Sequence, residues 1–160
     1  MKKEWLIVGM TDFDNTKCTA IKNQTFVKPN GGLWASPYTP DDEYKSEWHR
    51  FVSEEMQDKN SENGMVFDFK EESRIYTIDT QEDLINLLNT YGYIDSGYSS
   101  LFPDFERISK HFDVLHLTER GQWATRLPTK NSKYNLYGWD VECCLILNAD
   151  VIKDCSYVKL

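Results

Sequence analysis

The segment from residue 28 to residue 38 concentrates residue types that bind ligands. Its sequence, KPNGGLWASPY, holds a cation, two adjacent glycines, a tryptophan, a serine and a tyrosine. Gly31 and Gly32 can adopt a positive φ and let the backbone approach a ligand closely. We therefore predict a strand, a tight turn and a second strand whose side chains line a pocket; the alternative is a structural hairpin around a buried tryptophan. The candidate ligand-binding side chains are Lys28, Trp34, Ser36 and Tyr38.

Carboxylates interrupt the apolar stretch 139–147, which has the sequence WDVECCLIL. On a strand, Asp140 and Glu142 would share one face. Carboxylates are rare in buried strands unless they are paired or line a cleft. Glu142 is therefore a candidate to bind a ribose hydroxyl or to stabilise positive charge on a sugar carbon. The alternative is a structural partner for Arg126 or Lys28.

His116 and Thr118 alternate with apolar residues in the stretch VLHLT, so we expect both to project from one strand face. Enzymes that hydrolyse phosphodiesters with a His-x-Thr motif normally need two copies, and this sequence contains one. The motif therefore does not predict that reaction. The alternatives are a pair that contacts a ligand and a core histidine whose ring nitrogens are satisfied by neighbours.

The cysteines give no metal or redox motif. No pair has C-x-x-C spacing, so we expect neither a zinc site nor a redox site. Adjacent Cys143 and Cys144 would point to opposite faces of a strand and behave as buried thiols. A Cys–His hydrolase would need one of them exposed beside His116, which the apolar stretch disfavours. The four cysteines are Cys18, Cys143, Cys144 and Cys155.

Length, composition and charge limit the class of protein. A chain of 160 residues suits one domain, residues 1–160, and 40% hydrophobic with 14% aromatic residues favours a globular fold over disorder. A formal net charge of −8 disfavours general nucleic-acid binding through phosphates. No apolar run approaches the roughly 20 residues of a membrane helix. Glu4 interrupts the short apolar run at the start, so we predict a strand there, no signal peptide and a cytoplasmic protein.

Hydrophobic periodicity predicts a mixed α and β chain. A helix capped by Thr80 should bury Leu84, Leu87, Leu88 and Tyr91 and end at Gly92, because Asp83 completes a capping box. Polar loops are expected at 58–64 and 93–101, with a polar excursion at 121–135. Further helices are expected at 41–52 and 103–112. The expected strands are 5–10, 19–28, 33–36, 65–70, 74–79, 114–117, 139–147 and 151–158.

The order of these features resembles the ADP-ribosyltransferase superfamily. A cation ends an early strand, a glycine turn leads into an aromatic-Ala-Ser strand, a helix follows, and a late strand carries a glutamate. Enzymes of that superfamily typically use an early His or Arg, a central Tyr or Ser and a late Glu. In this sequence Lys28 would stand at the first position, Ser36 or Tyr38 at the second, and Glu142 at the third.

The resemblance implies an α+β fold: a split, mainly antiparallel pair of small sheets with flanking short helices, and NAD in the cleft between the sheets. Glu142 would bind the ribose 2′-hydroxyl and stabilise the oxocarbenium-like carbon, with Ser36 or Tyr38 as the second catalytic residue. A protein, nucleic-acid or small-molecule acceptor would then take ADP-ribose, and water would give NAD hydrolysis. The residues expected to contact NAD are Lys28, Gly31, Gly32, Trp34, His116 and Thr118.

A non-catalytic interaction protein, such as an inhibitor or antitoxin, is the alternative function. The acidic balance, the small size and aromatic residues such as Tyr91, Tyr93 and Tyr98 would suit a protein partner. Under either function, a role as a toxin or in host conflict stays open. Lys28, Ser36 or Tyr38, and Glu142 in one cleft would favour the transferase, whereas Glu142 sealed in an ion pair without a cavity would favour the interaction protein.

Overall fold

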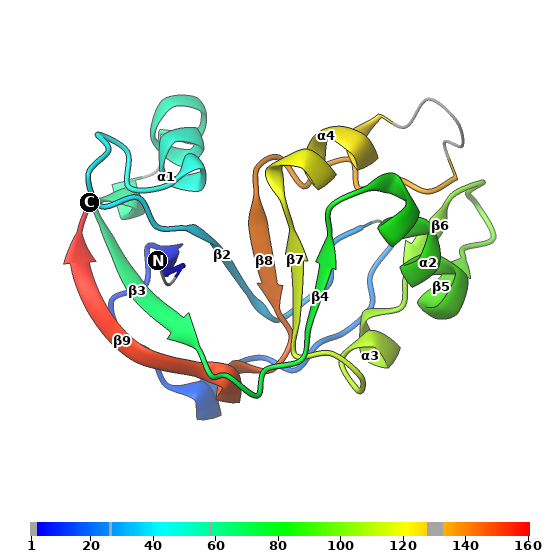
Figure 1. Cartoon of the computed structure of the whole chain (residues 1–160), viewed down its shortest axis with the longest axis horizontal. Helices are drawn as coiled ribbons and strands as arrows, with labels where there is room; N and C mark the ends of the chain where they lie inside the picture. The colour runs from blue at the N-terminus through cyan, green and yellow to red at the C-terminus, as the bar shows by residue number, and fades with distance from the viewer. Residues whose placement is uncertain (1–2, 26, 58, 128–132) are drawn as a thin grey trace.

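A computed structural model describes residues 3–25, 27–57, 59–127 and 133–160, and it has a mixed α and β fold with a mostly antiparallel sheet and a few short helices (Figure 1). The strands are β1 (Trp5–Val8), β2 (Leu33–Pro37), β3 (Asn63–Phe69), β4 (Ile75–Ile78), β5 (Gly92–Ile94), β6 (Leu101–Pro103), β7 (Val114–Leu117), β8 (Cys143–Ile146) and β9 (Ile152–Lys159). The α-helices are α1 (Glu47–Phe51), α2 (Gln81–Tyr91), α3 (Phe105–Ile108) and α4 (Glu119–Arg126). None of these helices is long and apolar enough to cross a membrane, among the residues described.

Seven strands form one hydrogen-bonded sheet in the order β4-β7-β8-β2-β1-β3-β9, and β5 pairs with β6 in a separate hairpin. Among the strand pairs of this sheet in the described residues, β4 and β7 alone run parallel. The expectation of two separate sheets is therefore corrected. The two halves form one sheet, because β1 joins β2 through the pairs Trp5↔Pro37 and Leu6↔Ser36. The connection between the halves β4-β7-β8-β2 and β1-β3-β9 is therefore short, and Figure 1 shows the sheet curving strongly between them.

Side-chain alternation on β7 and β8 produces two cores, one on each face of the sheet. On one face, Leu115 and Leu145 pack under α2 and α3 together with Trp139. On the other face, Val114 and Ile146 pack with residues of β1 and β3. Both strands are buried on both faces, which explains why their sequences are almost continuously apolar.

Helix α2 confirms its predicted limits and its predicted cap. Thr80 Oγ1 accepts a hydrogen bond from the Asp83 backbone N–H at 3.2 Å, and Asp83 Oδ2 accepts one from the Thr80 N–H at 2.8 Å. Of the four residues predicted to be buried, Leu84, Leu87 and Leu88 are buried and Tyr91 is only partly buried; the C-cap is Gly92. Local hydrogen bonds fix both the start and the register of this helix.

Two other helices are shorter than their hydrophobic patterns predict. Helix α1 begins at Glu47 because Ser46 Oγ accepts from the His49 N–H at 3.0 Å, and it continues as a π-helical turn over Val52–Met56. Helix α3 begins after its N-cap Asp104 and covers only Phe105–Ile108. Within the predicted helix 41–52, residues 41–46 form turns and bends; within 103–112, Pro103 is the last residue of β6 and residues 109–111 form a turn.

Three expectations about the chain path are wrong. The expected strand 19–28, of which residue 26 lies outside the described residues, otherwise forms only the bridge Lys22↔Asn30; near its end, the Val27 carbonyl accepts from the Trp139 indole instead of from a neighbouring strand. The expected strand 139–147 is confined to β8, so Glu142 precedes the strand instead of lying within it. The expected polar excursion 121–135 contains most of α4, and residues 128–132 lie outside the described residues.

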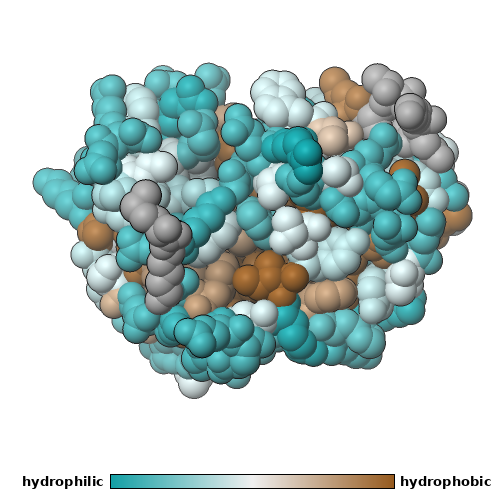
Figure 2. All heavy atoms as spheres, viewed as in Figure 1, coloured by the Kyte–Doolittle hydropathy of each residue, from teal (hydrophilic) through white to brown (hydrophobic). Residues whose placement is uncertain are grey.

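Helices α1 and α4 stand at the same end of the large sheet, at the top of Figure 1. Figure 2 shows a mostly polar surface on this face, with apolar atoms visible mainly in the middle, between the two halves of the molecule. Its outline is notched between the parts that cover α1 and α4. A cavity lies between these two helices, at the end of the sheet where β7 ends and β8 begins.

Candidate functional site

The adjacent glycines Gly31 and Gly32 serve the packing of the chain against itself. Both have a positive φ, +81° and +75°. A Cβ on Gly31 would lie 2.6 Å from the carbonyl oxygen of Ala20, and one on Gly32 would lie 3.0 Å from that of Ile146. Both glycines line a cavity of about 240 Å³ beside the segment 10–19, and none of the other predicted ligand-binding residues lines it.

Lys28 and Trp34 line a different, smaller pocket of about 150 Å³ at the start of β2. Lys28 Nζ lies 5.8 Å from the centre of a Trp34 ring, and Trp34 packs edge-on against Trp139 with ring centroids 4.7 Å apart. The Trp139 indole N–H donates to the Val27 carbonyl at 2.7 Å. The pocket thus combines rigid aromatic walls with one cation.

Ser36 and Tyr38, the predicted second position of the triad, line none of the three cavities found among the described residues. Ser36 is fully buried opposite Leu6, and its hydroxyl has no hydrogen-bond partner among the described residues. Tyr38 is partly buried, and its backbone N–H donates to the Glu4 carbonyl. The structure therefore does not bring either side chain beside Glu142 at a cavity.

Glu142 lies where the chain enters β8, and it contacts two cationic or basic side chains. Its Oε1 accepts a hydrogen bond from Lys3 Nζ and lies 2.9 Å from His116 Nε2. The side chains of His116 and Glu142 are 15% and 19% exposed, whereas that of Lys3 is 48% exposed. The His116 ring packs edge-on against Trp5, with ring centroids 5.1 Å apart. His116 is thus held between a core ring and a carboxylate.

The pKa of the Glu142 carboxyl is set by two opposing effects. Burial raises this pKa, but the hydrogen bonds from His116 and Lys3, together with their positive charge, outweigh burial and bring it below its ordinary value. Glu142 is therefore ionised at neutral pH. An ionised carboxylate accepts hydrogen bonds and attracts positive charge, as the sequence interpretation requires.

Thr118, the other half of the His-x-Thr pair, caps α4. Its Oγ1 accepts from the Gly121 N–H at 3.0 Å and donates to Asp79 Oδ1. Thr118 lies beyond the end of β7 and does not share the strand face of His116. Its hydroxyl therefore already donates and accepts hydrogen bonds within the protein.

The largest cavity, about 470 Å³, lies between α1 with its π-helical extension, helix α4 and residues 140–142. Carboxylates outnumber guanidinium groups around it, and both arginines are paired: Arg50 with Glu47, and Arg126 with Asp140. Trp123 on α4 is 72% exposed at its rim. The cavity is lined by Glu47, Arg50, Phe51, Glu54, Glu55, Glu119, Gln122, Trp123, Arg126, Asp140, Val141 and Glu142.

The cavity of Glu142 and the pocket of Lys28 adjoin each other, because Asp140 and Val141 line both. The chain segment 140–142 thus separates a mostly acidic space from a space with a cation and three indoles. An elongated ligand that lies across this segment would meet Glu142 on one side and Lys28 on the other.

Three residues of this region escaped the sequence analysis: Lys3, Gln122 and Trp123. Lys3 belongs to a terminal basic tip, and its contact with Glu142 joins residues 139 positions apart, which no local pattern reveals. Gln122 and Trp123 lie on α4, which was not predicted. The signal for α4 was present in the sequence, because Thr118 followed by Glu119 has the character of a helix start.

The buried thiols of Cys143 and Cys144 do not form a nucleophilic pair with His116. Cys144 lies opposite His116 in the β7–β8 ladder but is fully buried. Burial raises the pKa of Cys143 to about 12 and that of Cys144 well above its ordinary value. Protonated, buried thiols are poor nucleophiles, so the structure agrees with their interpretation as small apolar side chains.

No protein-family model, curated protein or solved structure matches this chain. The chemical capacity of the site follows from its own residues. These offer an ionised carboxylate at a cavity, a neighbouring cation and aromatic walls. Such a set can bind a polar, partly cationic ligand and stabilise positive charge that develops next to the carboxylate.

Proposed function

We propose that this chain is a mono-ADP-ribosyltransferase-like enzyme that cleaves NAD and transfers ADP-ribose to an acceptor. One observation carries the proposal: the ionised Glu142 lines a cavity that shares Asp140 and Val141 with the pocket of Lys28 and Trp34. An ADP-ribosyltransferase-like fold, with its two half-sheets joined through β1 and β2, is part of the same proposal, supported by the mixed, mostly antiparallel sheet with short helices.

The charge distribution supports one orientation of NAD. The nicotinamide ring of NAD is a cation, and it suits the cavity in which carboxylates outnumber guanidinium groups. The pyrophosphate is anionic and suits Lys28, which acts as a point charge. Trp34 and Trp139 offer aromatic walls to the adenosine half. The ribose next to nicotinamide then lies near Glu142.

The proposed reaction breaks the bond between the ribose C1′ and the nicotinamide nitrogen. The bonding electrons leave with nicotinamide, which becomes neutral, and C1′ acquires oxocarbenium character. Glu142 accepts a hydrogen bond from the ribose 2′-hydroxyl and stabilises this positive charge. A nucleophilic atom of the acceptor then bonds to C1′ and loses its proton to the solvent. With water as the acceptor, the products are ADP-ribose and nicotinamide.

Calorimetric titration with NAD tests the binding part of the proposal. We expect saturable binding by the wild type and roughly tenfold weaker binding by Lys28→Ala, about 1.4 kcal/mol, because one cation next to the phosphates is lost. Lys70→Ala is the matched control, since Lys70 lies outside all three cavities. A folded wild type that binds no NAD up to millimolar concentration contradicts the proposal.

A non-catalytic protein-interaction module, such as an inhibitor or antitoxin, is the second candidate function. It is favoured by Tyr137, which is 61% exposed and lines none of the three cavities, and by Trp123, which is 72% exposed at the rim of the large cavity. The tyrosines expected at an interface, in contrast, pack against rings of their own chain: Tyr91, Tyr93 and Tyr98. Under this function the folded wild type binds no NAD, and Glu142→Gln behaves like the wild type.

A further inference from the structure

Both polar partners of Glu142 contact the same oxygen atom. Lys3 Nζ donates to Oε1, and His116 Nε2 lies 2.9 Å from Oε1. Oε2 has no hydrogen-bond partner in the part of the chain that the structure describes. Since Glu142 also lines the large cavity, its carboxylate is fixed through one oxygen and keeps the other available to a ligand.

The position of the His116 ring is itself fixed. His116 lies on β7 between two neighbouring strands, paired with Thr77 of β4 on one side and with Cys144 of β8 on the other. The ring of Trp5 packs edge-on against it at an interplanar angle of 83°. Because an ionised carboxylate can only accept a hydrogen bond, the hydrogen between the two groups belongs to His116 Nε2. His116 is thus a rigid donor to Oε1.

We propose that His116 and Lys3 are positioning residues, which hold Oε1 of Glu142 so that Oε2 is left to accept the hydrogen bond of the ribose 2′-hydroxyl. This inference rests on the proposed function for the identity of the substrate. The pKa of the Glu142 carboxyl can be measured without NAD, so the positioning role and the proposed function can fail separately.

Other charged groups act on Glu142 from the elements around the cavity. They belong to α1 and its extension, to α4 and to the segment before β8. Two of the carboxylates are neutralised by their arginine partners. The remaining carboxylates disfavour ionisation of Glu142 and oppose the effect of His116 and Lys3. The charged groups other than Glu142 that line the cavity are Glu47, Arg50, Glu54, Glu55, Glu119, Arg126 and Asp140.

The first experiment measures the pKa of the Glu142 carboxyl by ¹³C NMR as a function of pH, in protein without NAD. His116→Ala and Lys3→Ala should each raise this pKa, because each removes a donor that favours the ionised form. His116→Gln should raise it less, because its amide keeps an N–H donor. His111→Ala and Lys22→Ala, which remove the same residue types far from Glu142, should leave it unchanged. An unchanged pKa in both Lys3→Ala and His116→Gln overturns the proposal.

The second experiment measures NAD cleavage by nicotinamide release. His116→Ala should lower kcat about tenfold or more, with KM for NAD within about twofold, because a hydrogen bond to a charged group is lost next to the reacting atoms. His116→Gln should recover part of kcat. The acidic limb of the pH profile should move to higher pH in Lys3→Ala, because the pKa of Glu142 rises.

Outcomes of the two experiments separate the inference from the proposed function. If the wild type releases no nicotinamide, the proposed function fails, and the proposed role of His116 and Lys3 in it fails as well; the carboxyl titration still decides whether they hold Oε1. If Glu142→Gln is inactive while His116→Gln and Lys3→Ala keep the wild-type kcat and pH profile, the function stands and the positioning role is overturned. Lys3 is exposed, so its variant should fold even if His116→Ala does not.

Discussion

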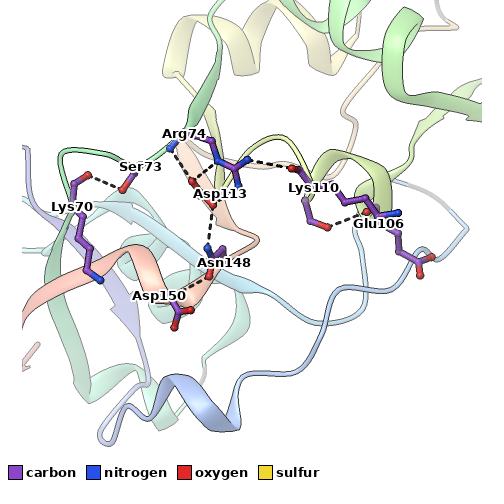
Figure 3. Close-up of polar contacts among 9 residues, drawn as sticks. Lys70, Ser73, Arg74, Glu106, Lys110, Asp113, Asn148 and Asp150 are labelled. Carbon is purple, nitrogen blue, oxygen red and sulfur yellow. Dashed lines mark hydrogen bonds and ion pairs between the residues drawn. The ribbon is translucent and has the colours of Figure 1, made fainter.

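Asp113 and Glu142 occupy comparable places at opposite ends of one strand pair. Asp113 directly precedes β7, Glu142 directly precedes β8, and these two strands are antiparallel. Figure 3 shows both oxygens of Asp113 in use: Arg74 Nη2 and Asn148 Nδ2 donate to Oδ1 at 2.8 and 3.1 Å, and Arg74 Nε and its backbone N–H donate to Oδ2. Among the described residues, Glu142 has partners on one oxygen only, and it lies at a cavity.

The difference separates a carboxylate that holds the fold from one that can act on a ligand. Hydrogen bonds from Arg74 overcome the effect of burial and lower the pKa of Asp113 to about 2, so its charge is permanent at neutral pH and fully compensated. The charge of Glu142 is also stabilised, but its oxygen Oε2 is left to accept a hydrogen bond from a ligand. Ion pairing alone therefore does not distinguish the two; the free oxygen and the adjacent cavity do.

The largest expected effect comes from exchanging each carboxylate for its amide. Glu142→Gln should lower NAD cleavage at least about a hundredfold, since it removes the charge next to the developing cation, and should change the free energy of unfolding by less than about 1 kcal/mol. Asp113→Asn should show the reverse, with lost stability and a nearly unchanged kcat. Nicotinamide release and urea unfolding of both variants measure the two quantities.

Comparable losses of activity in these two amide variants would contradict the proposed difference in role between Asp113 and Glu142. Glu71→Gln serves as the control for both, because Glu71 is exposed and lines none of the three cavities. A Glu142→Gln protein that keeps the wild-type rate of nicotinamide release would remove Glu142 from the catalytic machinery and leave it as a second structural carboxylate.

Stability against pH gives the second prediction. The folded-state pKa of Asp113, about 2, lies below its ordinary value of 3.8, so its contribution is present above pH 4 and is lost as the pH falls through 2. The free energy of unfolding of the wild type should therefore exceed that of Asp113→Asn by about 2 kcal/mol at pH 7, and the difference should disappear between about pH 4 and pH 2. Urea unfolding at several pH values measures this difference, and a difference that does not change with pH contradicts the prediction.

The features that the sequence predicted correctly are those determined by neighbouring residues. The box formed by Thr80 and Asp83 fixed helix α2, and the apolar run of β7 matched its strand from Val114 to Leu117. The failures have long-range causes. The indole of Trp139 donates to the carbonyl of Val27, 112 residues away, so this carbonyl is not available to a strand ladder.

The candidate site follows the same rule. Glu142 could be singled out as a carboxylate beside an apolar run, and Lys28 and Trp34 as a cation near an aromatic ring, because these are local patterns. The contact between Lys3 and Glu142 could be identified only from the folded structure. The same holds for the finding that Gly31 and Lys28 line different cavities. Spacing in sequence placed these glycines next to the ligand, whereas the structure gives them a close backbone contact of their own.

Gly31 provides the third prediction, which compares the glycine turn with the pocket of Lys28. Gly31→Ala should lower the free energy of unfolding by roughly 1–2 kcal/mol, because a Cβ at positive φ would also meet the Ala20 carbonyl. Gly97→Ala is the matched control, since a Cβ there meets no heavy atom within 4 Å. NAD affinity should be unchanged in both. If Gly31→Ala weakens NAD binding as much as Lys28→Ala does, the glycine turn belongs to the NAD site, as its sequence predicted.

The smallest expected effect concerns Ser36, which the sequence placed in the catalytic triad. Its buried hydroxyl has no partner among the described residues, so Ser36→Ala removes a desolvated polar group and loses no hydrogen bond. We expect the free energy of unfolding to stay the same or rise by up to about 1 kcal/mol, with NAD cleavage unchanged. Ser46→Ala is the matched comparison, because that buried serine caps α1 and its loss should cost about 1 kcal/mol. A Ser36→Ala protein that is stable but inactive would show that the hydroxyl reaches the substrate in another conformation, and it would restore Ser36 beside Glu142 in the reaction.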